Sequence, residues 1–154
     1  MSRFDIRFTA YGEPKGQPRP RAFARRMGNK YVARVFDAGT AEGWKSAVAM
    51  AAKPFAPAAP LTGPVEVTLG FFFARPKSHY QGNNPERELR VGAPHFHQSR
   101  PDIDNLAKAV LDALTQLGIF WRDDSQVCQI WAHKFYSDKS GCTIGVVEAI
   151  DTQD

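Results

Sequence analysis

The stretch that most constrains this chain runs from residue 100 to residue 114 and has the sequence RPDIDNLAKAVLDAL. A proline is followed at once by two carboxylates, Asp102 and Asp104, and then by apolar residues at helical spacing. Pro101 cannot donate a backbone hydrogen bond and biases the residue before it towards extended backbone. We therefore predict that a helix begins just after Pro101, that Asp102 or Asp104 caps it, and that Gly118 ends it.

Acidic residues are concentrated in and just after this stretch. Five of the sixteen acidic residues of a chain with net charge +4 lie between residues 102 and 124. Phosphodiester cleavage needs hard oxygen ligands, because Mg²⁺ takes carboxylates and water in an octahedral shell. A helix N-terminus also favours negative charge. We expect Asp102 and Asp104 to converge at the helix entry and to form a metal site with an acid of the pair Asp123–Asp124.

Asp104, Lys108 and Asp112 lie four residues apart along one edge of the predicted helix. The simplest interpretation is a surface ladder of ion pairs, each worth about 0.3–0.5 kcal/mol. This ion-pair interpretation accounts for the presence of Asp112. Lys108 has a second interpretation, in which its ammonium group offsets phosphate charge or orients an attacking water.

Basic residues gather in the amino-terminal part of the chain. Seven lysines and arginines, and no acidic residue, lie between Lys15 and Phe36. Prolines stiffen this run and aromatic residues interleave it, which favours contact with a nucleic-acid backbone over a merely solvated loop. The candidate DNA-binding residues are Lys15, Arg19, Arg21, Arg25 and Arg26.

The order of these motifs resembles the RusA family of Holliday junction resolvases. The similarity rests on PDIDNLAKAVLDAL, on DDSQV after it and on GEPKGQPRPR upstream, and it spans roughly residues 11 to 150. It implies a homodimeric endonuclease that cuts four-way DNA junctions by paired incisions with Mg²⁺, for which Mn²⁺ can substitute. By residue match, the catalytic set is Asp102, Asp104 and Asp124 as metal-binding acids and Lys108 as the essential lysine, with Asp123 a weaker candidate.

Two other functions stay open from the residues alone. One is a metal-dependent nuclease that acts on flaps, RNA or another branched substrate. The other is a non-catalytic nucleic-acid-binding module whose acids are only caps and ion-pair partners. His95 and His97 lie in a long segment without periodicity; they are candidates for metal or DNA contact, although histidines in such loops more often do neither.

Composition limits the class of protein. A chain of 154 residues with 43% hydrophobic residues predicts a single domain, residues 1–154, with a substantial core. The sequence has neither an apolar run of about 18 residues nor a signal-peptide region, so we expect no membrane span and a cytoplasmic protein. The family resemblance implies that it is bacterial or phage-encoded. Cys128 and Cys142 are expected to be reduced and unpaired.

Hydrophobic periodicity predicts an α+β fold, a two-layer domain with a mixed β-sheet and helices packed on one face. If the last two strands form a hairpin that turns near residues 137–141, Cys142 lies opposite about Tyr136 and Cys128 near the far end. Long loops are expected at 12–21 and 75–100. The predicted strands are 3–11, 31–36, 65–73, 126–136 and 142–150, and the predicted helices are 40–53 and a second one that ends near Leu117.

Overall fold

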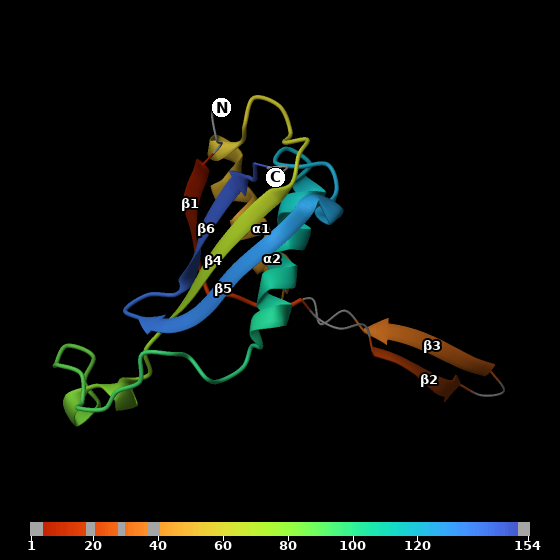
Figure 1. Cartoon of the computed structure of the whole chain (residues 1–154). Helices are drawn as coiled ribbons and strands as arrows, with labels where there is room; N and C mark the ends of the chain where they lie inside the picture. Colours follow the sequence, from red (N-terminus) through yellow and green to blue (C-terminus); the bar gives the residue numbers. More distant parts are fainter. Residues whose placement is uncertain (1–4, 18–20, 28–29, 37–40, 151–154) are drawn as a thin grey trace.

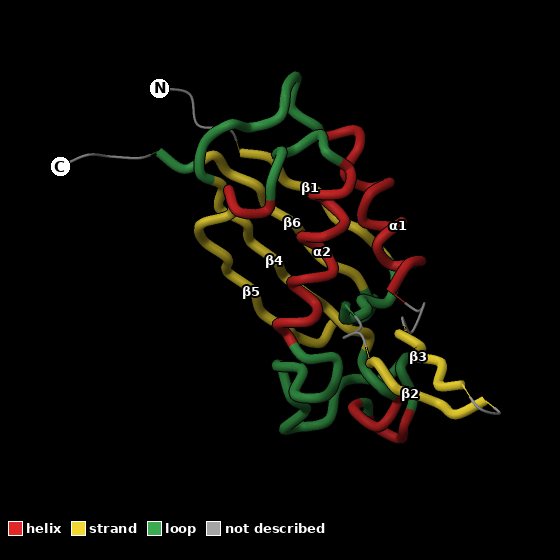
Figure 2. Tube along the Cα trace, turned by 90° about the vertical axis from the view of Figure 1, so that its right-hand side faces the viewer, coloured by secondary structure: helices red, strands yellow, loops and turns green. Residues whose placement is uncertain are grey.

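The computed structural model describes residues 5–17, 21–27, 30–36 and 41–150 (Figure 1). The predicted α+β architecture is confirmed: a mixed four-stranded sheet carries two helices on one face (Figures 1 and 2). The strands are β1 (Asp5–Tyr11), β2 (Arg21–Met27), β3 (Lys30–Phe36), β4 (Val65–Ala74), β5 (Val127–Ser137) and β6 (Gly141–Glu148), and the helices are α1 (Ala41–Ala52) and α2 (Ile103–Leu117).

The order of strands in the main sheet is β1-β6-β4-β5. The last two strands therefore do not pair with each other as a hairpin. β6 lies between β1 and β4 and is antiparallel to both, whereas β5 pairs with β4 in parallel. Parallel neighbours need a crossover connection, and the loop after β4 together with α2 provides it. β4 is the most deeply buried strand, so it takes a central position, and the more exposed β5 lies at the edge.

The hydrophobic core lies between the sheet and the helices. The apolar face of α2 contributes Leu106, Val110 and Leu114, all fully buried, and packs over β4 residues such as Leu69 and Phe71. Replacing one of these leucines by alanine would cost about 2–5 kcal/mol, because the cavity that remains collapses only partly. The position of α2 on the sheet is therefore firmly set, and with it the direction in which the start of the helix points.

α2 begins and ends as the sequence predicts. Asp102 occupies the N-cap position, with φ −72° and ψ 144°. Gly118 ends the helix in the left-handed conformation, with φ 71°, and its N–H bonds to the carbonyls of Leu114 and Thr115. A side chain rarely tolerates this backbone conformation, which is why glycine is favoured there.

A two-stranded hairpin formed by β2 and β3 extends from the main sheet (Figure 1). The sequence predicted β3 but assigned the start of β2 to a loop, because RAFARRM lacks a clear apolar alternation. The long segment after β4, residues 75–100, also projects from the domain. Both projections leave the end of the sheet at which α2 begins (Figure 1). Among the described residues, no helix is long and apolar enough to cross a membrane.

Candidate functional site

The entry turn of α2 presents two exposed carboxylates. Asp102 at the N-cap makes no side-chain capping bond. In the first helical turn, Oδ1 of Asp104 accepts a hydrogen bond of 2.9 Å from the backbone N–H of Asn105. The helix thus starts without using the carboxylate of Asp102 as a cap. A metal ion at this end would find hard oxygen donors beside a helix terminus that favours negative charge.

A lysine of the sheet holds the chain that leads into this turn. Nζ of Lys134 on β5 donates to the carbonyl oxygens of Ser99, at 2.7 Å, and Pro101, at 2.8 Å. The peptide bond between Arg100 and Pro101 is cis. Sequence reasoning missed Lys134, since its partners lie 33 and 35 residues away along the chain and no local pattern marks it.

The basic amino-terminal segment packs against the same helical turn. The backbone N–H of Gln17 donates to the carbonyl oxygen of Asn105 at 2.9 Å. A Cβ placed on Gly16 would lie only 3.1 Å from Cβ of Asn105 and 3.6 Å from Cβ of Pro101. This close approach leaves little room for a side chain at residue 16, and it brings the segment that follows Lys15 against Pro101 and Asn105, which flank the two acids in the sequence.

The predicted DNA-binding residues are described to different extents. Nζ of Lys15 lies 3.8 Å from Oε1 of Glu13, and the lysine side chain is 40% exposed. Arg19 lies outside the described residues. Arg21, Arg25 and Arg26 belong to β2, for which the structure describes the course of the backbone. Their assignment to DNA stays a prediction.

Lys108 lies one turn after Asp104 on α2 and is exposed. Within the described ranges, ion pairs join Arg7 to Asp5 and Lys15 to Glu13, and none joins Lys108 to Asp112. The ion pair that the surface-ladder interpretation expects between Lys108 and Asp112 is therefore not formed within the described part of the chain. Its ammonium group shares the entry end of α2 with the two acids.

The pair Asp123–Asp124 begins a short 3-10 turn, η4 (Asp124–Gln126). Oδ1 of Asp123 accepts from the N–H of Ser125 at 2.9 Å, and Oε1 of Gln126 accepts from the N–H of Asp123 at 3.1 Å. The bond from Ser125 lowers the pKa of the Asp123 carboxyl. These bonds give Asp123 a role in the turn itself. Asp124 is exposed.

This turn lies at the opposite end of α2 from Asp102. Nε1 of Trp121 donates to Oγ1 of Thr115, in the last part of the helix, at 2.8 Å. Gln126 donates to the carbonyl oxygens of Leu61 and Gly63, next to the start of β4. A helix of 15 residues is about 22 Å long. Within one chain, Asp102, Asp104 and Lys108 therefore lie towards the start of α2, and Asp124 lies beyond its end.

The distance between these two places measured along β5 is similar to the length of α2. η4 directly precedes Val127, and Lys134, which binds Pro101, lies seven residues further along the strand. Seven residues of a strand span about 23 Å. In the part of the chain that the structure describes, no three His, Cys, Asp or Glu side chains form a group able to hold a metal ion. Asp102 and Asp104 are exposed at the start of α2, and their convergence with Asp124 on a metal ion stays a prediction.

The two loop histidines pack against aromatic rings. His97 stacks on Phe73, with ring centroids 4.1 Å apart, and lies 5.0 Å from the ring of Tyr136. Burial lowers the pKa of His97, and its buried Nδ1 has no hydrogen-bond partner among the described residues. His95 stacks on Phe135 at 5.9 Å. These contacts attach the long loop to the sheet and explain both residues without a metal.

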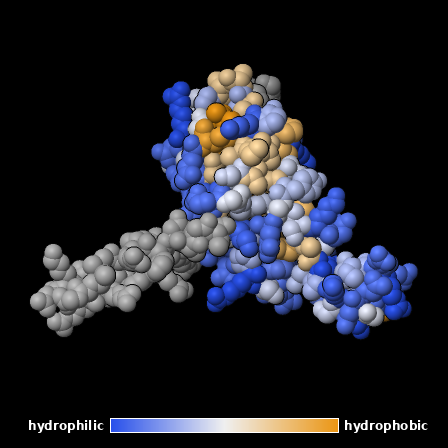
Figure 3. All heavy atoms as spheres, turned by 180° about the vertical axis from the view of Figure 1, so that it is seen from behind, coloured by the Kyte–Doolittle hydropathy of each residue, from blue (hydrophilic) through white to orange (hydrophobic). Residues whose placement is uncertain are grey.

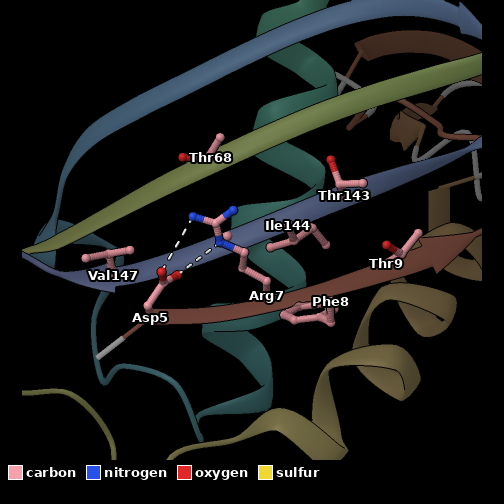
Figure 4. A pocket seen from close by; sticks show the side chains of 9 residues that line it. Asp5, Arg7, Phe8, Thr9, Thr68, Thr143, Ile144 and Val147 are labelled. Atoms are coloured by element: carbon pink, nitrogen blue, oxygen red, sulfur yellow. Dashed lines mark hydrogen bonds and ion pairs between the residues drawn. The ribbon is translucent and has the colours of Figure 1, made fainter. Parts of the chain in front are cut away.

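The open face of the sheet holds a cavity of about 480 Å³ (Figure 4). Threonines and aliphatic residues of β1, β4 and β6 line most of it, and Arg7 pairs there with Asp5 at 3.2 Å. A single paired carboxylate gives no set of metal ligands. On the opposite face, hydrophilic side chains predominate near the entry end of α2, and apolar surface gathers towards the other end (Figure 3). The hydrophilic end is a more favourable contact surface for a nucleic-acid phosphate backbone than the apolar end.

Known proteins resemble this chain over most of its length. Residues 11–147 match the model of the family described as "Endodeoxyribonuclease RusA". The chain is also 34% identical over 134 residues to "Uncharacterized protein YqaN" of Bacillus subtilis (strain 168), covering 87% of this chain and 89% of that protein. The family match includes the basic segment, α2 and the Asp123–Asp124 turn, which are the motifs that carried the resemblance in the sequence.

Proposed function

Because the chain belongs to the RusA family of endodeoxyribonucleases, we propose that it resolves four-way DNA junctions by Mg²⁺-dependent cleavage. The observation that carries the proposal is the entry end of α2. There the segment around Gly16, which leads into the basic hairpin, lies against Pro101 and Asn105, the sequence neighbours of Asp102 and Asp104. An acid pair beside a cationic segment is what phosphodiester cleavage requires, since the DNA backbone must be attracted and a cation held against it.

The two acids at the start of α2 fit a magnesium ion. Mg²⁺ is usually bound by one or two carboxylates, with waters and substrate phosphates completing its octahedral shell. The exposed carboxylates of Asp102 and Asp104 supply hard oxygens, and Mn²⁺ accepts the same donors. When bound, the ion would activate a water and stabilise negative charge on the leaving oxygen. Asp124 is proposed as a further ligand.

Lys108 and the basic segment have separate roles in this proposal. The ammonium group of Lys108 projects from the same helix one turn beyond Asp104, so it would offset charge on the scissile phosphate or orient the attacking water. Lys15, Arg19, Arg21, Arg25 and Arg26 would bind phosphates away from the cut. Affinity then depends on the basic residues, and cleavage on the acids and Lys108.

The paired incisions would come from a homodimer. Two cuts on opposing strands of a junction need two active sites related by two-fold symmetry, which a C₂ dimer supplies. We place the activity in recombination and repair of DNA, and hence in the cytoplasm of a bacterium or of a phage host.

The test is cleavage of a synthetic four-way junction by the purified protein, with and without Mg²⁺ or Mn²⁺, with the nicks mapped on all four strands. We expect metal-dependent nicks placed symmetrically on one pair of opposing strands. Linear duplex, flap and RNA substrates are the controls. Faster cleavage of a flap or of RNA would assign the protein to another nuclease activity, and junction binding without cleavage under any metal would assign it to a binding module.

A further inference from the structure

The open face of the sheet, which is turned away from the helices, carries side chains that the proposed nuclease site does not use. β1, β4 and β5 run in the same direction and β6 runs against them. The strand register aligns the outward residues in rows across this face. One row is Arg7, Gly145, Thr68 and Trp131, and the next row is Thr9, Thr143, Gly70 and His133.

Small residues occupy the middle of these rows. Thr68, Thr143 and Gly145 line the cavity of about 480 Å³ (Figure 4). A Cβ placed on Gly70 would lie 2.6 Å from Oγ1 of Thr143 and 3.5 Å from the ring of Phe135. A side chain at residue 70 would therefore fill the space between the cavity and the aromatic residues of β5.

Aromatic side chains follow one another along β5 at the edge of this face. Trp131, His133 and Phe135 are two residues apart, so they project to the same side of the strand. His133 and Phe135, together with His95 and Phe96 of the long loop, line a second hollow of about 310 Å³. Packing against His95 accounts for Phe135. It does not account for Trp131, which is 66% exposed.

The opposite edge of the face supplies a cation. Arg7 on β1 lies in the same row as Trp131, and its guanidinium points over β6 towards β4 (Figure 4). Its Nε lies 3.2 Å from Oδ1 of Asp5, and both side chains of this pair are exposed. An exposed ion pair is weak, so a phosphate can replace Asp5 as the partner of Arg7.

The charge of the face changes along the strands. Asp5 and Glu66 share the row that precedes Arg7 and Trp131. The two rows beyond Trp131 contain no acidic residue; the last of them is Tyr11, Gly141, Phe72 and Phe135. A polyanion is therefore repelled least over the part of the face that carries the aromatic side chains.

We propose that the open face binds single-stranded DNA, with unpaired bases stacked on Trp131 and His133 and a phosphate bound by Arg7. Sites for single strands combine cationic groups with aromatic side chains on which bases stack. A four-stranded sheet that stacks bases on aromatic side chains of its open face is a recurrent solution. A duplex hides the faces of its bases, so stacking selects unpaired strands. DNA is favoured over RNA because the family acts on deoxyribonucleic acid.

This surface adjoins the proposed nuclease site at one end. Lys134 lies between His133 and Phe135 in β5, and its ammonium group binds the carbonyl oxygen of Pro101, next to Asp102. An unpaired strand that leaves the acids can thus pass over the end of β5 onto the open face. The inference goes beyond the proposed cleavage, and binding at this face needs no metal ion.

The fluorescence of Trp131 tests the proposal. The chain has three tryptophans, of which Trp44 and Trp121 are buried. A base that stacks on the open face should therefore quench Trp131 alone. Oligothymidylate titrated into the full chain in EDTA should quench the fluorescence to saturation, and a duplex of the same length should not. Trp131→Phe keeps an aromatic ring, so it should still bind the oligonucleotide while the quenching disappears.

Substitutions measure the contributions to affinity, with a labelled oligothymidylate followed by anisotropy. The four arginines 19, 21, 25 and 26 are replaced by Gln in every variant, so that the basic segment contributes little. Trp131→Ala should weaken binding roughly tenfold. Arg7→Gln should reduce the slope of log K against log salt by about 0.7, the value for one phosphate of a single strand.

Ile130→Ala is the matched control for Trp131→Ala. Ile130 is the preceding residue of the same strand and is 47% exposed, but it pairs with the core residue Val67 and therefore faces the helix side. Its loss should leave the affinity unchanged. Circular dichroism establishes that the variants fold.

Four outcomes would overturn the proposal. They are an unchanged Trp131 fluorescence at saturating oligothymidylate, equal affinities of Trp131→Ala and Ile130→Ala, equal quenching by the duplex, and tighter binding of an oligouridylate. A fluorescence that changes when the protein alone is diluted would assign the face to self-association instead. Because all these measurements are made in EDTA, a failure of junction cleavage leaves them unaffected, and their failure leaves the proposed nuclease function standing.

Discussion

Nζ of Lys134 donates to the carbonyl oxygen of Pro101 at 2.8 Å and so ties the edge strand of the sheet to the residue that precedes Asp102. A second bond, to the carbonyl of Ser99 at 2.7 Å, fixes the same loop. The ammonium group therefore positions the start of α2 from outside the helix. It is a positioning residue, and its loss should disturb the metal site without removing a ligand.

Lys134→Met should lower the rate of junction cleavage while leaving junction affinity close to wild type. The two hydrogen bonds from a charged donor also stabilise the fold, so we expect a loss of about 1–2 kcal/mol in the free energy of unfolding. Single-turnover cleavage and denaturant titration measure the two effects. Lys139→Met, an exposed change on the turn after β5, serves as the control and should leave both unchanged. Cleavage by Lys134→Met at the wild-type rate would show that the loop keeps its position unaided.

Asp102→Asn, Asp104→Asn and Asp124→Asn should each abolish cleavage and preserve junction binding, because the acids serve chemistry and the phosphate contacts supply affinity. Cleavage and gel-shift assays at several Mg²⁺ concentrations check this. Asp112→Asn is the matched control, since this residue lies on the same helix and should keep its activity. Near wild-type rates in two of the three variants would refute the metal assignment.

Lys108→Ala should cut the single-turnover rate by roughly 100-fold or more, as expected for a group that acts in the transition state. Because Lys108 is exposed and lacks an ion-pair partner among the described residues, its stability and junction affinity should stay near wild type. Lys108→Arg keeps the charge and should recover part of the rate. An alanine variant as fast as wild type would leave Lys108 a surface residue.

Neutralising Arg19, Arg21, Arg25 and Arg26 together, each to Gln, should weaken junction binding and flatten its salt dependence. Each lost phosphate contact should reduce the slope of log K against log salt by roughly 0.9. Binding measured at four or more salt concentrations gives the slope. The basic run would be a solvated loop if the slope were unchanged.

The stability of the fold should decrease below neutral pH because of His97. Burial lowers its pKa in the folded chain, so the unfolded chain binds the proton more readily. The contribution of His97 is fully present above the unfolded pKa of about 6.5 and is lost as the pH falls from there through the lower pKa of the folded state. Denaturant titrations at pH 7.5 and pH 5 should show a smaller decrease for His97→Phe, which keeps the ring stacked on Phe73. His133→Gln, an exposed change, should behave as wild type.

The sequence by itself determined the local features of this protein. Pro101 and Gly118 set the bounds of α2 because proline and a left-handed glycine act through backbone geometry within a few residues. The apolar alternation of β4 likewise predicted the central strand. Residue type and spacing marked the acids, Lys108 and the basic segment as candidate site residues. The family motif joined them into the single hypothesis of a metal-dependent nuclease.

Only the tertiary structure decided which of these residues meet. Local patterns do not encode strand order, so the sequence did not indicate that β5 is an edge strand parallel to β4. The contact of Gln17 with Asn105 and that of Lys134 with Pro101 depend on packing between segments far apart in the chain. The length of α2 separates Asp124 from Asp102, because a packed helix is rigid and cannot bring its two ends together.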